Sequence, residues 1–87
     1  MGESAFQAFQ RSKEAEHAEK KAYTEGPLRA SIVQAFSEVV DVTYHADGDE
    51  TVTIHRKGSE PLLEVNVTWD SKRGMFKDVA RALINAE

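Results

Sequence analysis

The sequence contains no cysteine, only two prolines and a single tryptophan. Without cysteine, the chain can form no disulfide bond, thiolate metal site or cysteine nucleophile. No apolar run approaches the ~18 residues of a transmembrane helix, and the N-terminus lacks the basic and apolar segments of a secretory signal. These absences predict a cytoplasmic protein that does not associate with a membrane.

Basic residues are in the minority, with 11 Lys and Arg against 15 Asp and Glu, which gives a formal net charge of −4. This excess of acid disfavours a general polyanion binder. Hydrophobic residues make up 40% of the chain and charged residues 30%, as is typical of a globular protein, and 87 residues suffice for one small domain.

Two helical segments are predicted before the first strand. Residues 3–24 are rich in Ala, Glu, Lys and Gln, but their apolar positions form no coherent stripe, which is typical of a solvated helix or an arm. Gly26 is predicted to end this helix, and Pro27 is predicted to begin a second helix with one apolar face that reaches about residue 37.

Three strands with alternating polarity follow these helices. Their apolar positions are predicted to face the core and their threonine-rich positions to face solvent, as in an antiparallel sheet that is covered on one side. The turns Asp47-Gly48-Asp49 and Gly58-Ser59 set the register and predict strand order 1-2-3, with the third strand at an edge. The predicted inward residues are Val40, Val42, Tyr44, Val52, Ile54, Leu63, Val65, Val67 and Trp69.

An amphipathic helix, capped by Asp70 or Ser71, is predicted to complete the domain. The resulting fold class is α+β: an N-terminal helix is followed by α-β-β-β-α, a three-stranded antiparallel meander with helices on one face. We divide the chain into an N-terminal helical arm, residues 1–25, and a domain, residues 26–87. The predicted inward stripe of the last helix comprises Phe76, Val79, Ala80 and Leu83.

Basic residues gather at the start of this last helix. Arg73, Lys77 and Arg81 follow one another at four-residue spacing, so these three side chains form one stripe, with Lys72 beside its start. Basic side chains and free backbone N–H groups at a helix start can capture phosphate. The alternative interpretation is a solvated helix edge, because most surface charges serve solubility.

The α-β-β-β-α order, with bases opening the last helix, resembles the double-stranded-RNA-binding domain over residues 27–87. Ser71-Lys72-Arg73 fits the first three places of the S-K-K-x-A-K run of that family, whereas Phe76 stands at the place of the final lysine. The resemblance implies duplex RNA binding through the basic start of the last helix. The residues concerned are Lys72, Arg73, Lys77 and Arg81.

Two histidines and two acids share the predicted polar face of the sheet. The register sets Asp41 opposite His55, a pair that can serve as a metal half-site or an acid–base couple. His45 falls opposite Thr51, displaced from that pair, while Glu64 lies on the third strand. The chain has no Gly-x-Ser-x-Gly, His-Glu-x-x-His or phosphate-loop motif. We therefore predict no catalytic residue, cofactor or metal, and keep a small enzyme or metal protein that uses this face as the third hypothesis.

Some apolar residues have no place in the predicted core and favour contact with another protein. Phe6 and Phe9 lie together on one side of the first helix, while Val39 and Leu62 lie among the threonines of the polar sheet face. The leading hypothesis is a small, non-enzymatic binding or regulatory protein that acts through protein–protein contact, as a homodimer. A nucleic-acid-binding domain is the second hypothesis.

Overall fold

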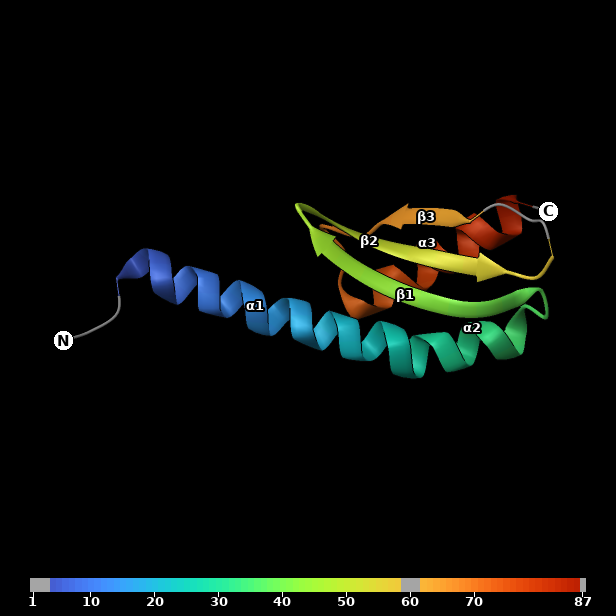
Figure 1. The fold of residues 1–87 in the computed structure, drawn as a ribbon, viewed down its shortest axis with the longest axis horizontal. Coiled ribbons are helices and arrows are strands. Elements are labelled where there is room, and N and C mark those ends of the chain that lie inside the picture. The colour runs from blue at the N-terminus through green and yellow to red at the C-terminus, as the bar shows by residue number, and fades with distance from the viewer. Residues whose placement is uncertain (1–3, 59–61, 87) are drawn as a thin grey trace.

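A three-stranded antiparallel sheet, with helices packed on one face, forms the body of the protein (Figure 1). The computed structural model describes residues 4–58 and 62–86. The predicted α+β class and strand order 1-2-3 are confirmed. In chain order the elements are α1 (Ala5–Tyr23), the π-helical segment η1 (Thr24–Leu28), α2 (Arg29–Ala35), β1 (Val39–Asp47), β2 (Asp49–Arg56), β3 (Leu63–Asn66) and α3 (Lys72–Asn85).

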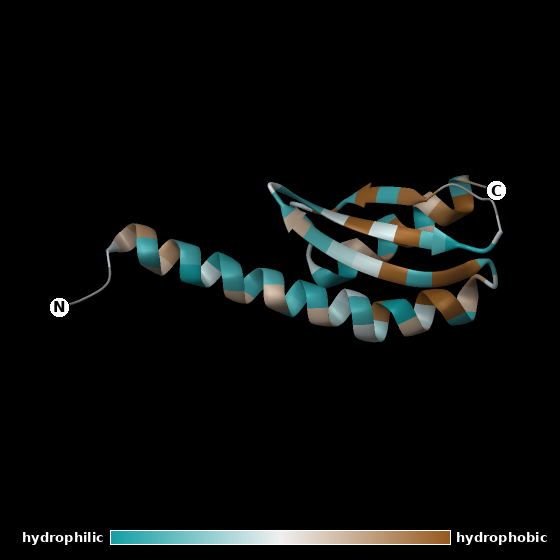
Figure 2. Cartoon of the chain, in the orientation of Figure 1, coloured by the Kyte–Doolittle hydropathy of each residue, from teal (hydrophilic) through white to brown (hydrophobic). Residues whose placement is uncertain are grey.

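α1, η1 and α2 follow one another without a break, and the first part of α1 extends well beyond the sheet (Figure 1). The molecule is accordingly elongated, with principal extents of 54 × 21 × 19 Å. In Figure 2 the hydrophobic colours gather on the strands and on α2, whereas most of α1 is hydrophilic. The predicted division of the chain after residue 25 therefore falls inside a continuous helical segment.

The predicted helix end at Gly26 is wrong. Gly26 and Pro27 both lie inside η1, where the backbone makes the wider turns of a π-helix. A proline in a regular α-helix removes one hydrogen bond and clashes with the carbonyl four residues earlier. A π turn changes this spacing, so the helical path continues past the proline. The helix then ends at Ala35, about two residues earlier than predicted.

The core lies between the inner face of the sheet and the helices. The register pairs Val42 with Ile54, and it pairs Val52 with Tyr44 on one side and Val65 on the other, as the turn chemistry predicts. Ser59 of the predicted second turn lies outside the described residues. The buried apolar core comprises Leu28, Ile32, Val39, Val42, Tyr44, Val52, Ile54, Val67, Met75, Val79 and Leu83.

A β-bulge at the start of β1 reverses the predicted facing of two valines. The pairing with β2 shifts between Val39 and Asp41, and a bulge of this kind inserts one extra residue into the strand. Val39 is consequently 2% exposed and belongs to the core, while Val40 is 48% exposed. The predictions that Val40 faces the core and that Val39 lies on the polar face are both wrong.

The segment between β3 and α3 leaves the strand pattern earlier than predicted. β3 ends at Asn66, and a turn follows in which the Asp70 N–H donates to the Val67 carbonyl at 3.0 Å. The alternation of inward and outward side chains therefore does not extend to Trp69, which is 94% exposed. The prediction that Trp69 lies in the core is wrong. In α3 the buried stripe contains Met75 in place of the predicted Phe76, which is exposed.

Candidate functional site

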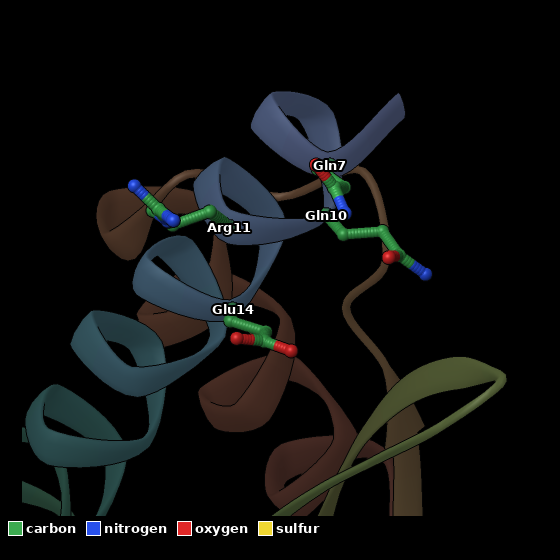
Figure 3. A pocket seen from close by; sticks show the side chains of 4 residues that line it. All are labelled: Gln7, Gln10, Arg11 and Glu14. Carbon is green, nitrogen blue, oxygen red and sulfur yellow. The ribbon is translucent and has the colours of Figure 1, made fainter. Parts of the chain in front are cut away.

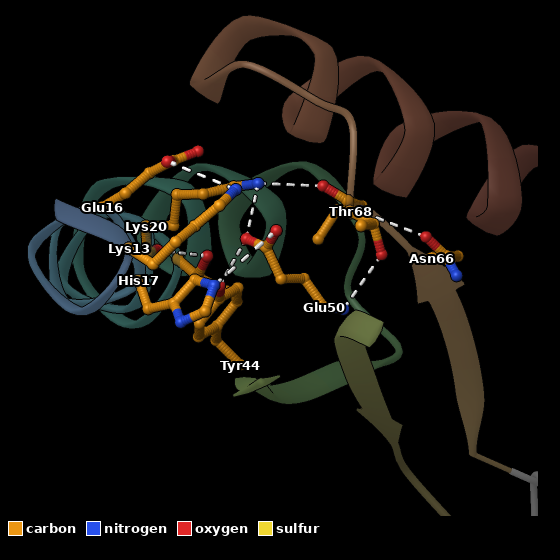
Figure 4. A network of polar contacts seen from close by, with 10 residues as sticks. Lys13, Glu16, His17, Lys20, Tyr44, Glu50, Asn66 and Thr68 are labelled. Carbon is orange, nitrogen blue, oxygen red and sulfur yellow. Dashed lines mark hydrogen bonds and ion pairs between the residues drawn. The ribbon is translucent and has the colours of Figure 1, made fainter. Parts of the chain in front are cut away.

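A buried polar cluster fastens α1 to the sheet near the point where the helix leaves it (Figure 4). The Lys20 ammonium lies 2.7 Å from Glu50 Oε1 and donates a hydrogen bond to the Val67 carbonyl at 2.9 Å. The Tyr44 hydroxyl donates to the same carboxylate oxygen at 2.6 Å. Only 4% of Lys20 and 2% of Glu50 are exposed, so the ion pair at which α1 and the sheet meet is buried.

The charges of this cluster are mutually satisfied. Burial alone would raise the pKa of Glu50, but the hydrogen bonds from Lys20 and Tyr44 and the charge of Lys20 hold it below its usual value. Burial, together with the bond to Glu50, raises the pKa of the Tyr44 hydroxyl, which therefore keeps its proton. His17 lies at the rim, with Nε2 3.9 Å from Glu50 Oε2. The cluster can hold α1 in place, but its reactive atoms do not reach the surface.

The sequence held one signal for this cluster. Glu50 has the same strand parity as Val52 and Ile54, so it occupies an inward position, where a charge requires a buried partner. From sequence alone, however, Glu50 reads as part of the acidic turn around Asp49. Lys20 likewise reads as the surface partner of Glu16, which stands four residues before it in a favourable helical spacing.

The projecting segment, residues 4–13, continues α1 beyond the cluster. A capping box fixes its start, because the Gln7 N–H donates to Ser4 Oγ at 3.2 Å and the Ser4 N–H donates to Gln7 Oε1 at 3.3 Å. Every residue from 4 to 12 is exposed, including Phe6 at 68% and Phe9 at 60%. A defined helix thus carries two phenylalanines into solvent.

The two phenylalanines lie on the face by which α1 docks on the sheet. Lys20 and Thr24 are buried on this face, and His17 is half-buried. Steps of three or four residues lead from Thr24 back to Phe6, and such steps keep side chains on one side of a helix. The docking face of α1 therefore continues past the sheet as an uncovered apolar face, which we call the Phe6/Phe9 face.

A hollow along the projecting segment offers no enclosed site. Its lining side chains all come from α1 itself, so its walls are neighbours on one helix (Figure 3). A groove of this kind lacks the second wall and the largely apolar lining that are typical of a small-molecule site. The lining residues are Gln7, Gln10, Arg11 and Glu14.

Side-chain carboxylates cover the outer edge of β1. The Tyr44 N–H donates to Glu25 Oε2 at 3.1 Å, and the Val42 N–H donates to Asp41 Oδ1 at 2.9 Å. Burial would raise the pKa of Glu25, but the bonds from Tyr44 and Lys21 hold it below its usual value. Because these amides are satisfied, the β1 edge is protected against pairing with another strand.

The histidines of the polar sheet face meet at a threonine. Thr43 Oγ1 lies 3.2 Å from His45 Nε2 and 3.4 Å from His55 Nε2. Asp41 stands opposite His55 in the register, as predicted, but its carboxylate contacts Arg29 at 3.3 Å. Within residues 4–58 and 62–86, no group of three or more His, Asp or Glu side chains is placed to hold a metal ion.

The basic start of α3 is exposed throughout. Ser71 is the N-cap, as predicted, and its hydroxyl accepts a hydrogen bond from the Gly74 N–H at 3.3 Å. Arg81 lies 3.9 Å from Asp78, an ion pair that is largely solvated. The helix thus presents the predicted basic stripe to solvent. The exposed bases are Arg73, Lys77 and Arg81 in the stripe and Lys72 beside its start.

Two carboxyl groups meet beside this basic stripe. A hydrogen bond with Asp78, with burial and the charge of Asp78, raises the pKa of Asp70 to about 6. One oxygen of Asp70 has no hydrogen-bond partner among the described residues when both carboxyl groups are ionised. Below the raised pKa, a proton on Asp70 can supply the missing donor. The pair also places negative charge among the bases of α3.

The predicted contact residues of the sheet divide between surface and core. Leu62 is 55% exposed at the start of β3, whereas Val39 is buried and can contact no partner. Trp69, which the sequence placed in the core, is instead 94% exposed, more than any other large apolar residue that the structure describes. It adjoins Thr68, whose hydroxyl accepts a bond from the Glu50 N–H at 3.0 Å, so it lies near the buried cluster.

Comparison of the chain with protein-family models, curated protein sequences and solved structures found no match. In the described part of the chain, none of the helices combines the length and the apolar character that a membrane span requires. The function of the protein must therefore be argued from its own residues.

Proposed function

We propose that the protein is a non-enzymatic binding protein that acts through protein–protein contact and assembles as a homodimer through the Phe6/Phe9 face. The observation that carries the proposal is the continuation of the α1 docking face beyond the sheet, with two large aromatic side chains left in solvent. Each phenylalanine would gain roughly 1.5–3 kcal/mol from full burial. A small domain commonly adds stability by oligomerising.

The absence of catalysis is part of the same proposal. A catalytic acid, base or nucleophile must come within hydrogen-bonding distance of a substrate. Lys20 and Glu50 lie 2.7 Å apart and are almost fully buried, and their hydrogen-bonding capacity is taken up by each other and by Tyr44 and Val67. These observations favour a structural role for the cluster, which stiffens the base from which the Phe6/Phe9 face projects.

Light scattering coupled to size exclusion tests the proposal. The full chain is expected at twice the monomer mass, and the Phe6→Ser/Phe9→Ser variant at the monomer mass. Ala8→Ser/Ala15→Ser is the matched control, because it changes two exposed residues on the opposite side of the same helix and should leave the dimer intact. Monomeric full-length chain at high micromolar concentration would refute the proposal.

Duplex RNA binding through the basic stripe of α3 is a second candidate. It is supported by the exposure of all four bases to solvent. The net charge of −4 and the Asp70–Asp78 pair next to the stripe weigh against it. A pull-down from native lysate, with and without nuclease, separates the candidates, because only partners bound through nucleic acid would be lost after digestion.

A further inference from the structure

We infer that the partner of the Phe6/Phe9 face is a second copy of this chain in an antiparallel arrangement, with Phe6 and Phe9 of each copy packed against Trp69 of the other. The inference rests on the proposed function and adds the docking site. It follows from the position of Trp69, from the charge distribution along α1 and from the length of the projecting segment.

Trp69 is an apolar surface near the base of the projecting segment. The carbonyl of Val67, two residues before Trp69, accepts the hydrogen bond from Lys20, which fixes this stretch of chain beside α1. Trp69 itself is 94% exposed, so nearly its whole indole is free for contact. Aromatic side chains of this size supply much of the energy at protein interfaces, particularly when they meet other aromatic rings.

The charges along α1 favour an antiparallel partner of the same sequence. Residues 4–13 contain two bases and no acid, whereas residues 14–19 contain three acids and neither Lys nor Arg. An antiparallel pair of α1 helices with its two-fold axis beside Lys13 sets the acidic residues 14–19 of each copy level with residues 7–12 of the other, which contain Arg11 and no acid. The exposed Asp47 and Asp49 add negative charge in the β1–β2 turn, at the end of the sheet from which α1 projects (Figure 1).

The spacing along α1 is consistent with a two-fold axis beside Lys13. Phe6 lies seven residues before Lys13, and Lys20 lies seven residues after it. At a rise of ~1.5 Å per residue, each distance is roughly 10 Å along the helix. The axis therefore brings Phe6 of one copy level with Lys20 of the other, next to the segment that carries Trp69. The contact is isologous and closes as a dimer.

The single tryptophan makes the contact directly measurable. On dilution from high to low micromolar concentration, Trp69 emission is expected to shift to the red in parallel with the loss of dimer mass. Phe6→Ser/Phe9→Ser should show the red-shifted emission at every concentration. Ile84→Ser is the control, because it removes an exposed apolar residue from the C-terminal part of α3 and should behave as the unmodified chain.

Because the chain has no cysteine, single cysteines test the antiparallel geometry. Lys13→Cys should form a disulfide-linked dimer under mild oxidation, since residues beside the axis come within the reach of a disulfide. Glu19→Cys should not, because its two copies would be separated by about 18 Å along the helices at ~1.5 Å per residue.

The outcomes separate this inference from the proposed function. The antiparallel arrangement would be overturned, and the proposed dimer would stand, if a dimer formed but its Trp69 emission did not change on dilution. Equal cross-linking of Glu19→Cys and Lys13→Cys would have the same meaning. A chain that is monomeric throughout would overturn both. Dilution-dependent emission together with selective cross-linking at residue 13 would support both.

Discussion

The ammonium of Lys20 lies 2.7 Å from the carboxylate of Glu50, and this buried ion pair joins α1 to β2. The Tyr44 hydroxyl and the Val67 carbonyl complete the coordination of the two charges. The contact gives the projecting segment a fixed base, because Lys20 is the first buried residue of α1. Removal of either charge would leave the other one buried without its partner.

Lys20→Met should therefore lower the free energy of unfolding by about 3–5 kcal/mol, the usual cost of an uncompensated buried charge. Lys21→Met is the matched control. Lys21 pairs with Glu25 at 3.0 Å but is largely solvated, so its loss should cost no more than ~1 kcal/mol. Urea denaturation followed by circular dichroism measures both values, and equal losses in the two variants would contradict the account.

The β-bulge predicts opposite consequences for two adjacent valines. Val39→Ala removes core volume and should cost about 1.5–3 kcal/mol of stability, whereas Val40→Ala should change it by no more than ~0.5 kcal/mol. Thermal and urea unfolding of the two variants measure the difference. A larger loss for Val40→Ala would show that β1 runs without the bulge and that simple alternation holds.

The Asp70–Asp78 pair predicts a component of stability that falls as pH rises. The folded pKa of Asp70, about 6, lies above its ordinary value of 3.8, so the folded state binds the proton more tightly. This stabilisation is complete below the ordinary value and is lost as the pH rises through about 6. Asp70→Asn replaces the proton with an amide donor and should stabilise the protein more at pH ~7.5 than at pH ~5.5.

Urea midpoints of the unmodified chain and of Asp70→Asn at the two pH values test this prediction. All other titratable groups are present in both proteins, so the difference between the proteins isolates Asp70. Glu25 and Glu50 have lowered pKa values, so the stability that they contribute is lost as the pH falls below their ordinary value of 4.5. A difference between the two proteins that is independent of pH would refute the proton on Asp70.

The basic stripe of α3 is expected to bind no duplex RNA at physiological salt. Should binding occur through phosphate contacts, it must weaken steeply as salt rises, with a log–log slope of roughly −0.9 per contact on B-form DNA. Lys72→Gln/Arg73→Gln/Lys77→Gln would then abolish the binding without unfolding the domain. Fluorescence anisotropy with a labelled duplex decides the question, and micromolar affinity lost in this variant would favour the nucleic-acid candidate.

The strand register could be predicted from sequence because local rules determine it. Alternating polarity, with tight turns at fixed positions, leaves one pairing that keeps Val52 and Ile54 in the core, and that pairing is the observed one. The bulge at Val39 could not be predicted in this way, because either of the two adjacent valines could face the core. Trp69 escaped it because β3 ends before alternation can reach that residue.

The remaining errors depend on contacts between distant segments. Pro27 reads as a helix boundary in any local analysis, yet tertiary packing holds η1 in a π-helical turn, with Thr24 and Leu28 both buried. The Lys20–Glu50 pair likewise exists only once α1 lies against the sheet. Phe6 and Phe9 looked unpatterned next to the alanines of α1, but they align with the docking face once that face is known.

Sedimentation equilibrium of the full chain and of a chain that lacks residues 1–12 tests the central claim most directly. The deletion removes the Phe6/Phe9 face but keeps Lys20, so the shortened chain should stay folded with its ion pair intact. We expect twice the monomer mass for the full chain and the monomer mass for the shortened one. Equal association states for the two proteins would contradict the account.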